Sequence, residues 1–445
     1  MKDARLGKVS LTIFSLSLLP NRITSDDVGF FRRRRSEATM GAGVAARRVV
    51  QRAEPEAMPL RAVIRAHSRK LGGTLAAHLE QVLAPAAAKG FRTMGPAEVA
   101  RLLGIQESTL REFARENGIG SQEKSRRSYT VEDLGELRRR LEAGSRVKGK
   151  YIPARREGDH LQVIVLVNFK GGSAKTTTSA HLMQYLALRG YRTLGIDLDP
   201  QASLTALLGV SAEIDIGEAD TMYGAIRLFD ERRPMSEIVR PTYLPNLKLA
   251  PGGLEIMEFE HEVPRKMMKD KSGLVFDRVQ EAIGSVESDY DVVVIDCPPN
   301  LGFLTLSALA AATAAVITIH PQFIDVMSMQ HFLTMTCDFL DAIAEGLGGE
   351  DTTYDWMRYL VTRYEPNDGP QNDMVALLRS QFGPYVLNHP ALKSTAISDA
   401  GLTNQTVYEV DRSAFNRATY DRAVESIDAV NGEIEGLIRK AWGRT

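Results

Sequence analysis

Residues 168–178 read NFKGGSAKTTT. Lys175 and Thr176 match the end of the phosphate-loop pattern G-x-x-x-x-G-K-[ST], but Phe169 and Ala174 stand where that pattern has its two glycines. The surrounding sequence argues against an accidental match. A buried-strand run, LQVIVLVNF, leads directly into the stretch, and a helix-forming run, SAHLMQYLALRG, follows it. Because strand, loop and helix in this order are the setting of a phosphate loop, we interpret the stretch as a variant loop.

The alternation of strands and helices continues beyond the loop. The runs YRTLGIDLDP, YDVVVIDCPP and AAVITIHP have the nearly continuous Val, Ile and Leu content of strands that are buried on both faces. Such strands separated by helical patterns indicate a parallel sheet with helices on either side. We therefore predict a doubly wound, mostly parallel α/β domain over residues 161–440.

The loop carries the groups that a nucleoside triphosphate requires. Phosphate binding needs backbone N–H groups at a helix N-terminus, an ammonium group and a hydroxyl for Mg²⁺. Lys175 supplies the cation and Thr176 the hydroxyl, while Lys170 adds a positive charge that the ordinary pattern lacks. A second lysine suggests extra charge neutralisation, delivered to the nucleotide of a partner subunit. The predicted phosphate-binding residues are Lys170, Gly171, Gly172, Ser173, Ala174, Lys175, Thr176 and Thr177.

Aspartates at strand ends complete the predicted site. Asp296 ends the run VVVID, where a carboxylate holds Mg²⁺ through water. Asp199 ends TLGIDLD and is placed to orient the attacking water, with Asp197 as its supporting residue. Taken alone, each aspartate could be a strand-end cap. As a pair beside a phosphate loop, they favour a catalytic role.

Charge is distributed unevenly along the chain. Residues 1–157 contain 31 basic and 17 acidic side chains, whereas residues 158–445 contain 24 basic and 39 acidic ones. A basic half of this kind is typical of proteins that bind a polyanion. The two cysteines, Cys297 and Cys337, exclude a disulfide framework and fit a reducing cytoplasm.

The basic half contains a helix-turn-helix pattern at residues 91–145. It reads as a helix from Pro96 to Leu103, a turn at Gly104 and a second helix from Glu107 to Asn117, then a basic wing hairpin. In a major groove the second helix and the wing would place polar and basic side chains against DNA. A helical protein-docking module is the alternative interpretation. The predicted DNA contacts are Ser108, Thr109, Arg111, Arg115, Arg126 and Arg127, with Lys393 as a further contact to nonspecific DNA.

Three other segments complete the expected organisation. Residues 1–57 have no lasting period and are interpreted as a disordered or wrongly translated leader, with the true start at Met40 or Met58. Residues 58–90 are expected to form a helical dimerisation arm, as two helices or one helix broken at its two glycines. Residues 146–160 are interpreted as a linker.

The motifs KGG-x-x-KTTT, DLDPQAS and DCPP resemble those of the deviant Walker A ATPases of the ParA/MinD family. Further stretches, among them YGAIR, FEHEVPR and LKSTAISDAGLTNQTVYEV, look like the RepA partition proteins of alphaproteobacterial replication-partition operons. The resemblance covers the chain from about residue 60 onward. Ala174 departs from the family's usual glycine.

The resemblance implies roles for individual residues. Lys170 would be the signature lysine, which reaches across an ATP-sandwiched homodimer, and Asp199 the hydrolytic aspartate. Lys175 would bind phosphates, and Thr176 and Asp296 would hold Mg²⁺. Thr362 and Arg363 fall where relatives approach the adenine.

The function implied is a weak, Mg²⁺-dependent ATPase in the cytoplasm, associated with the nucleoid. It would bind nucleoid DNA without sequence preference, respond to a ParB-type centromere-binding partner, and segregate copies of a plasmid or secondary replicon. The helix-turn-helix would bind an operator and repress the protein's own operon. A nucleotide-sensing repressor with little ATPase activity is the alternative. A membrane-cycling role is disfavoured, because the terminal IEGLIRKAWGRT is too short and weakly patterned for a membrane-binding helix.

Overall fold

The computed structural model describes residues 60–82, 89–123, 126–168, 170–210, 216–269, 275–346 and 353–444. The chain divides into two compact units, Met1–Lys70 and Leu71–Thr445. The predicted leader at 1–57 lies outside the described residues. Within the described segments, no helix is long and apolar enough to span a bilayer.

Helix α1 (Leu60–Val82) is continuous. The expectation of two helices, or of one helix broken at Gly72 and Gly73, is therefore wrong. A glycine inside a helix costs about 1 kcal/mol relative to alanine, which weakens a helix without ending it.

The remaining elements follow in chain order. The helices are α2 (Pro96–Leu103), α3 (Glu107–Glu116), α4 (Val131–Ala143), α5 (Lys175–Arg189), α6 (Ser203–Leu207), α7 (Met222–Ile226), α8 (Met235–Ile238), α9 (Met257–Lys269), α10 (Arg278–Gly284), α11 (Phe303–Ala311), α12 (Phe323–Gly346), α13 (Gly369–Phe382), α14 (Thr395–Leu402) and α15 (Arg417–Ala441). The strands are β1 (Ser121–Glu123), β2 (Arg126–Ser128), β3 (Gln162–Val167), β4 (Thr193–Asp197), β5 (Arg240–Pro241), β6 (Leu247–Ala250), β7 (Val292–Asp296), β8 (Ala314–Ile319) and β9 (Trp356–Val361).

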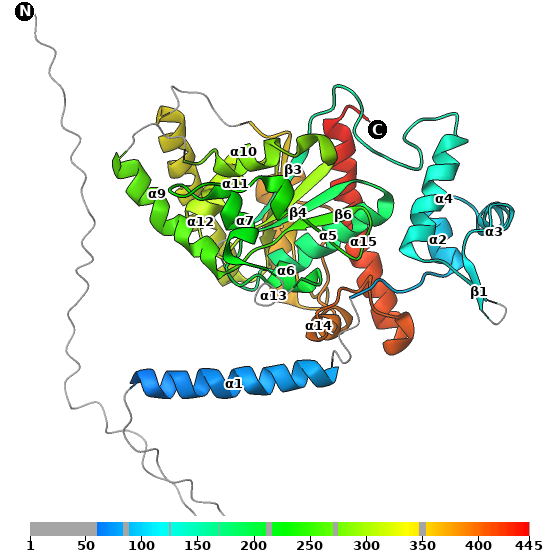
Figure 1. The fold of residues 1–445 in the computed structure, drawn as a ribbon, viewed down its shortest axis with the longest axis horizontal. Coiled ribbons are helices and arrows are strands. Elements are labelled where there is room, and N and C mark those ends of the chain that lie inside the picture. The colour runs from blue at the N-terminus through cyan, green and yellow to red at the C-terminus, as the bar shows by residue number, and fades with distance from the viewer. Residues whose placement is uncertain are drawn as a thin grey trace, which may run out of the picture. The chain divides into compact units, whose positions relative to one another are not determined.

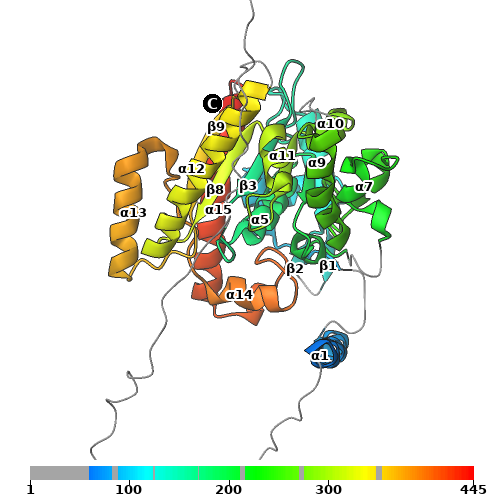
Figure 2. The ribbon, with the colours of Figure 1, turned by 90° about the vertical axis from the view of Figure 1, so that its left-hand side faces the viewer.

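Seven strands form one sheet in the order β5-β6-β4-β7-β3-β8-β9. All neighbouring strands are parallel except β5, which pairs antiparallel with β6. Helices α5 and α15 cover one face of this sheet, and α10 to α12 cover the other (Figures 1 and 2). The predicted doubly wound, mostly parallel sheet is confirmed. The sequence patterns did not reveal β5 and β6, which are short.

Side chains of β3 alternate between two hydrophobic cores. Val163 and Val165 point into the core that α7 to α13 cover. Ile164 and Leu166 point into the core that α5 and α15 cover, together with α2, α3 and α4. Because β3 lies between β7 and β8, its carboxyl end places the loop that follows it at the centre of the sheet.

The N-terminal part of the unit Leu71–Thr445 contains the helices α2, α3 and α4 and the two-stranded hairpin of β1 and β2. Helix α2 ends at Gly104, whose φ of 65° gives the left-handed turn that leads to α3. Strands β1 and β2 pair antiparallel as the wing, and α4 follows them. The predicted helices are confirmed, with Asn117 as the C-cap of α3 rather than its last residue.

Candidate nucleotide-binding site

The loop at 170–174 wraps around Lys175, the first residue of α5. The Lys175 side chain is buried, and its Nζ donates a hydrogen bond to the carbonyl oxygen of Lys170 at 3.4 Å. Burial lowers the pKa of Lys175, while the nearby charge of Asp296 acts in the opposite direction. An ammonium group held inside a loop at a helix N-terminus is the arrangement that binds phosphate oxygens.

Two residues of the loop have left-handed backbone conformations. Gly172 has φ 80° and Ala174 has φ 65°. Glycine adopts this region freely, whereas a Cβ there costs roughly 1 kcal/mol. The strain at Ala174 lies at the N-cap of α5, directly before Lys175.

An Ala174→Gly variant is expected to hydrolyse ATP at least as fast as the parent, because the substitution relieves this strain without removing a contact group. The measurement is steady-state phosphate release at saturating ATP. Ala143→Gly, at an exposed helical position, is the control and should leave turnover unchanged. A large loss of turnover in Ala174→Gly would show that the loop is built around the alanine.

Side chains from β8 and from the end of β9 brace the loop. The hydroxyls of Thr318 and Thr362 donate to Ser173, to its Oγ and to its carbonyl oxygen respectively, both at 3.0 Å. Arg363 donates from Nη1 to the carbonyl oxygen of Gly172 at 3.2 Å. The structure thus brings the two predicted adenine-side residues, Thr362 and Arg363, to the loop itself.

Asp296 has one satisfied and one free carboxylate oxygen. Its Oδ1 accepts a hydrogen bond from Ser179 Oγ at 2.8 Å. Its Oδ2 is buried and has no hydrogen-bond partner among the described residues. Burial raises the pKa of Asp296 to about 7, and the charge of Asp197 adds to the rise, whereas the hydroxyls of Thr176 and Ser179 lower it. A buried, unpaired carboxylate oxygen beside a threonine hydroxyl fits Mg²⁺, whose preferred ligands are oxygens.

Asp197 holds the segment that carries Asp199. Its Oδ1 accepts from the backbone N–H of Asp199 at 3.0 Å, and its Oδ2 accepts from the N–H and hydroxyl of Thr205 at 2.9 and 2.7 Å. Burial raises the pKa of Asp197 to about 6. Asp199 lies two residues beyond the end of β4, and its Oδ1 accepts from the N–H of Gln201 at 2.9 Å.

Lys170 forms an ion pair with Asp325, in the first turn of α12. The Asp325 side chain is buried, and its Oδ2 lies 3.3 Å from Nδ1 of His320. Asp325 was not predicted from the sequence, although an aspartate at the start of the helix after β8 is a recognisable signal. A cavity of about 270 Å³ opens here; it is lined by Asn168, Lys170, Gly171, Gly172, Ser173, His320, Gln322, Asp325 and Arg363.

The predicted DNA-contacting residues lie outside the nucleotide-binding site, on α3, on β2 and in the segment before α14. Helix α3 buries Leu110 and Ala114. The predicted contacts Ser108, Thr109, Arg111 and Arg115 are exposed on α3, and so are Glu112 and Glu116. Arg111 is paired to Glu107. The wing strand β2 contains Arg126 and Arg127. Lys393 lies in the segment before α14 and pairs with Glu365 at 2.9 Å.

Known proteins share this sheet and loop. The family model described as "AAA domain" matches residues 161–347. The chain is 53% identical over 400 residues to a Rhizobium rhizogenes protein named "Putative replication protein A", covering 89% of this chain and 98% of the relative. It is 34% identical to the chromosome partitioning protein ParA of Myxococcus xanthus, over 54% of this chain and 77% of that protein.

The chain belongs to the ParA/MinD family of deviant Walker A ATPases. A solved structure described as "Partition Protein" has a TM-score of 0.57, covers 82% of this chain and 98% of its own, and is 20% identical. That likeness supports the fold. The match to the rhizobial relative covers 89% of this chain and so extends beyond the ATPase fold.

Proposed function

We propose that this ParA-family chain is the partitioning ATPase of a plasmid or secondary chromosome, active as an ATP-dependent homodimer in the cytoplasm and on the nucleoid. The observation that carries the proposal is the second lysine of the loop. Lys170 lines the cavity beside the phosphate loop and pairs with Asp325, so it is held at the nucleotide site without serving as the buried loop lysine, which is Lys175. A lysine in this position suits contact with a nucleotide on a second subunit.

The site supports a division of roles among its residues. Lys175 and the loop at 170–177 bind the phosphates of ATP, with Thr362 and Arg363 bracing the loop. Thr176 and Asp296 hold Mg²⁺, which when bound neutralises charge on the phosphate oxygens. Asp199 orients the attacking water, while Asp197 fixes the backbone of its segment.

The basic amino-terminal part supports a second activity, binding to an operator. The exposed polar face of α3 and the arginines of β2 suit a major groove and its phosphates. We propose that this contact represses the chain's own operon, and that residues 58–90 act as a dimerisation arm. Lys393 is proposed to contact nonspecific DNA. A ParB-type protein bound at the centromere is the proposed stimulator of hydrolysis.

The test is ATP turnover by the wild type in three conditions: alone, with nonspecific DNA, and with DNA plus a ParB-type centromere-binding protein. The proposal expects slow basal turnover that rises when both are present. Footprinting on the DNA upstream of the gene, with ADP and with ATP, tests the operator contact. Protection of that DNA without any hydrolysis would favour the alternative, a nucleotide-sensing repressor.

A further inference from the structure

Two helices lead away from the nucleotide site. Helix α5 begins with Lys175, and α6 begins at Ser203, shortly after Asp199. The last carbonyl groups of a helix have no partners within the helix and carry the negative end of its dipole. In this chain the far ends of both helices are contacted by basic side chains from the amino-terminal side: Arg138 of α4 at the end of α5, and Lys89, which precedes α2, at the end of α6.

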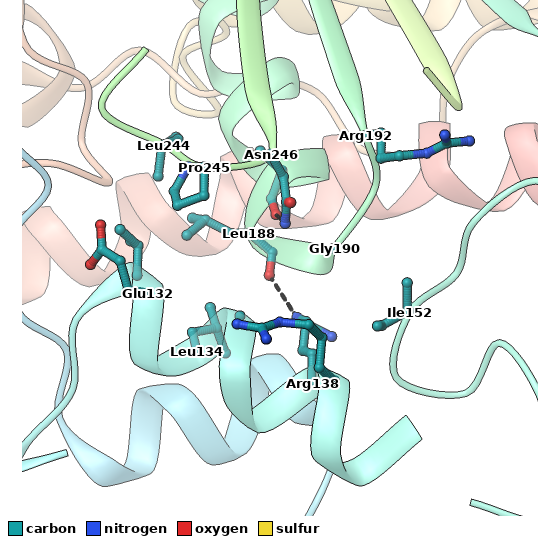
Figure 3. A pocket seen from close by; sticks show the side chains of 14 residues that line it. Glu132, Leu134, Arg138, Ile152, Leu188, Gly190, Arg192, Leu244, Pro245 and Asn246 are labelled. Carbon is teal, nitrogen blue, oxygen red and sulfur yellow. Dashed lines mark hydrogen bonds between the residues drawn. The ribbon is translucent and has the colours of Figure 1, made fainter. Parts of the chain in front are cut away.

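Arg138 of α4 meets the end of α5. Its Nε and Nη2 donate to the carbonyl oxygen of Leu188, in the last turn of α5, at 3.2 and 2.8 Å. Nη2 also donates to the carbonyl oxygen of Leu102, in the last turn of α2, at 2.8 Å, and Nη1 to that of Tyr151 at 2.8 Å. Figure 3 shows the contact between Arg138 and Leu188. One guanidinium thus joins the end of α5 to the end of α2, the first helix of the predicted helix-turn-helix.

The position of Arg138 is tightly constrained. Only 5% of the residue is exposed, and a Cβ added to Gly190 would lie 3.1 Å from its Cδ. Gly190 also has φ 100°, so the C-cap of α5 needs glycine for its conformation and for its closeness to Arg138. Burial lowers the pKa of Arg138 to about 10, which leaves the guanidinium charged at neutral pH.

Lys89 meets the end of α6. It directly precedes the helix-turn-helix, and its ammonium donates to the carbonyl oxygen of Leu207, the last residue of α6. The same ammonium lies 3.1 Å from Oε1 of the buried Glu409. Glu409 in turn accepts from Gln184 of α5 at 3.1 Å, so Lys89 is connected to both helices that leave the nucleotide site.

The space beside Arg138 is hollow. A cavity of about 310 Å³ separates part of α4 from the segment at 244–246, and it is lined by Leu134, Ile152, Leu188, Leu244 and Pro245 among others (Figure 3). Packed cores resist small displacements, whereas an unfilled cavity does not. On this side part of α4 therefore lacks packed neighbours, and the hydrogen bonds of Arg138 hold α4 to the end of α5.

We propose that Arg138 and Lys89 are positioning residues that couple the nucleotide site to the DNA-binding helices. When the loop binds phosphates, the start of α5 and the segment before α6 become more ordered. Arg138 at the end of α5 and Lys89 at the end of α6 transmit this ordering to α2, α3 and α4. The consequence for operator affinity rests on the proposed function, whereas the coupling itself does not.

Hydrogen exchange on the full chain tests the coupling without DNA. In the wild type, a nonhydrolysable ATP analogue should slow amide exchange in α2 and α4 as well as in α5. In Arg138→Gln, slowing should persist at the start of α5 but be lost in α2 and α4. Two results would overturn the coupling. One is a wild type in which the analogue does not slow exchange in α2 and α4; the other is an Arg138→Gln variant in which exchange there slows as much as in the wild type.

Two controls separate coupling from general damage. Arg139→Gln removes an exposed arginine that, among the contacts described, pairs only with Glu136. Arg101→Ala removes the ion pair between α2 and Asp428 of α15, and this ion pair does not involve α5 or α6. Both should behave as wild type.

If Arg138→Gln does not fold, Arg138→Lys retains one donor for Leu188 and should lose part of the slowing. For Lys89, the double variant Lys89→Met/Glu409→Gln avoids leaving Glu409 charged and unpaired, and should weaken the slowing in α2.

Affinity for the upstream DNA, with and without the analogue, provides the second readout. Allosteric couplings are typically about 5- to 150-fold, and we expect the nucleotide effect on affinity to fall below about twofold in Arg138→Gln. Wild-type protein that binds no upstream DNA would overturn the operator role, while the exchange experiment still decides the coupling.

Discussion

An Asp199→Ala variant is expected to lose ATP turnover by about 100-fold or more, because a positioned proton acceptor contributes roughly 10²- to 10⁴-fold to catalysis. Asp199 is nearly buried, and its backbone is held by Asp197, so its carboxylate has a defined position. The phosphate loop is built without it, so ATP affinity should change little. The measurements are phosphate release with DNA and partner present, and nucleotide binding by equilibrium titration.

Asp373→Ala is the matched control for this variant, since Asp373 is exposed on α13 and should affect neither quantity. Unchanged hydrolysis in Asp199→Ala would contradict the catalytic assignment. Loss of ATP binding together with turnover would instead show that Asp199 supports the structure of the site.

Replacement of both Arg111 and Arg115 by alanine is expected to weaken operator binding by about 100-fold or more, since each arginine that contacts a base contributes roughly 1–3 kcal/mol. Both side chains are exposed on α3, and neither is part of the ATPase fold. Basal ATP turnover should therefore be unchanged. The measurement is affinity for the upstream DNA at a fixed salt concentration, compared with affinity for unrelated DNA.

The double variant Arg146→Ala/Lys148→Ala removes the same net charge from an exposed segment outside the helix-turn-helix. It should reduce affinity for operator and unrelated DNA alike, and only modestly. If it weakened operator binding as much as the α3 variant does, the recognition would be general electrostatic attraction rather than contact by α3.

Much of the ATPase fold and of its site was predictable from local patterns. Continuous apolar runs predicted β3, β4, β7 and β8. The loop lysine and Asp199 lie in the segments after β3 and β4, and Asp296 is the last residue of β7. Ala174 stands where the phosphate-loop pattern has glycine, and its φ of 65° lies in the left-handed region that favours glycine. The continuous α1 was not predicted, because two adjacent glycines were interpreted as a helix break. Their free-energy cost within a helix is too small to end it.

The sequence by itself determined the fold class and supplied the candidate site residues, because strand, loop and helix signals extend over a few neighbouring positions and the family's motifs are short. Only the tertiary structure decided what holds those residues in place. Asp325 pairs with Lys170, Thr362 supports Ser173, and Arg138 joins α2 to α5, each across a long separation in the chain. Such contacts depend on how the elements pack, and no local pattern of charge or hydrophobicity encodes them.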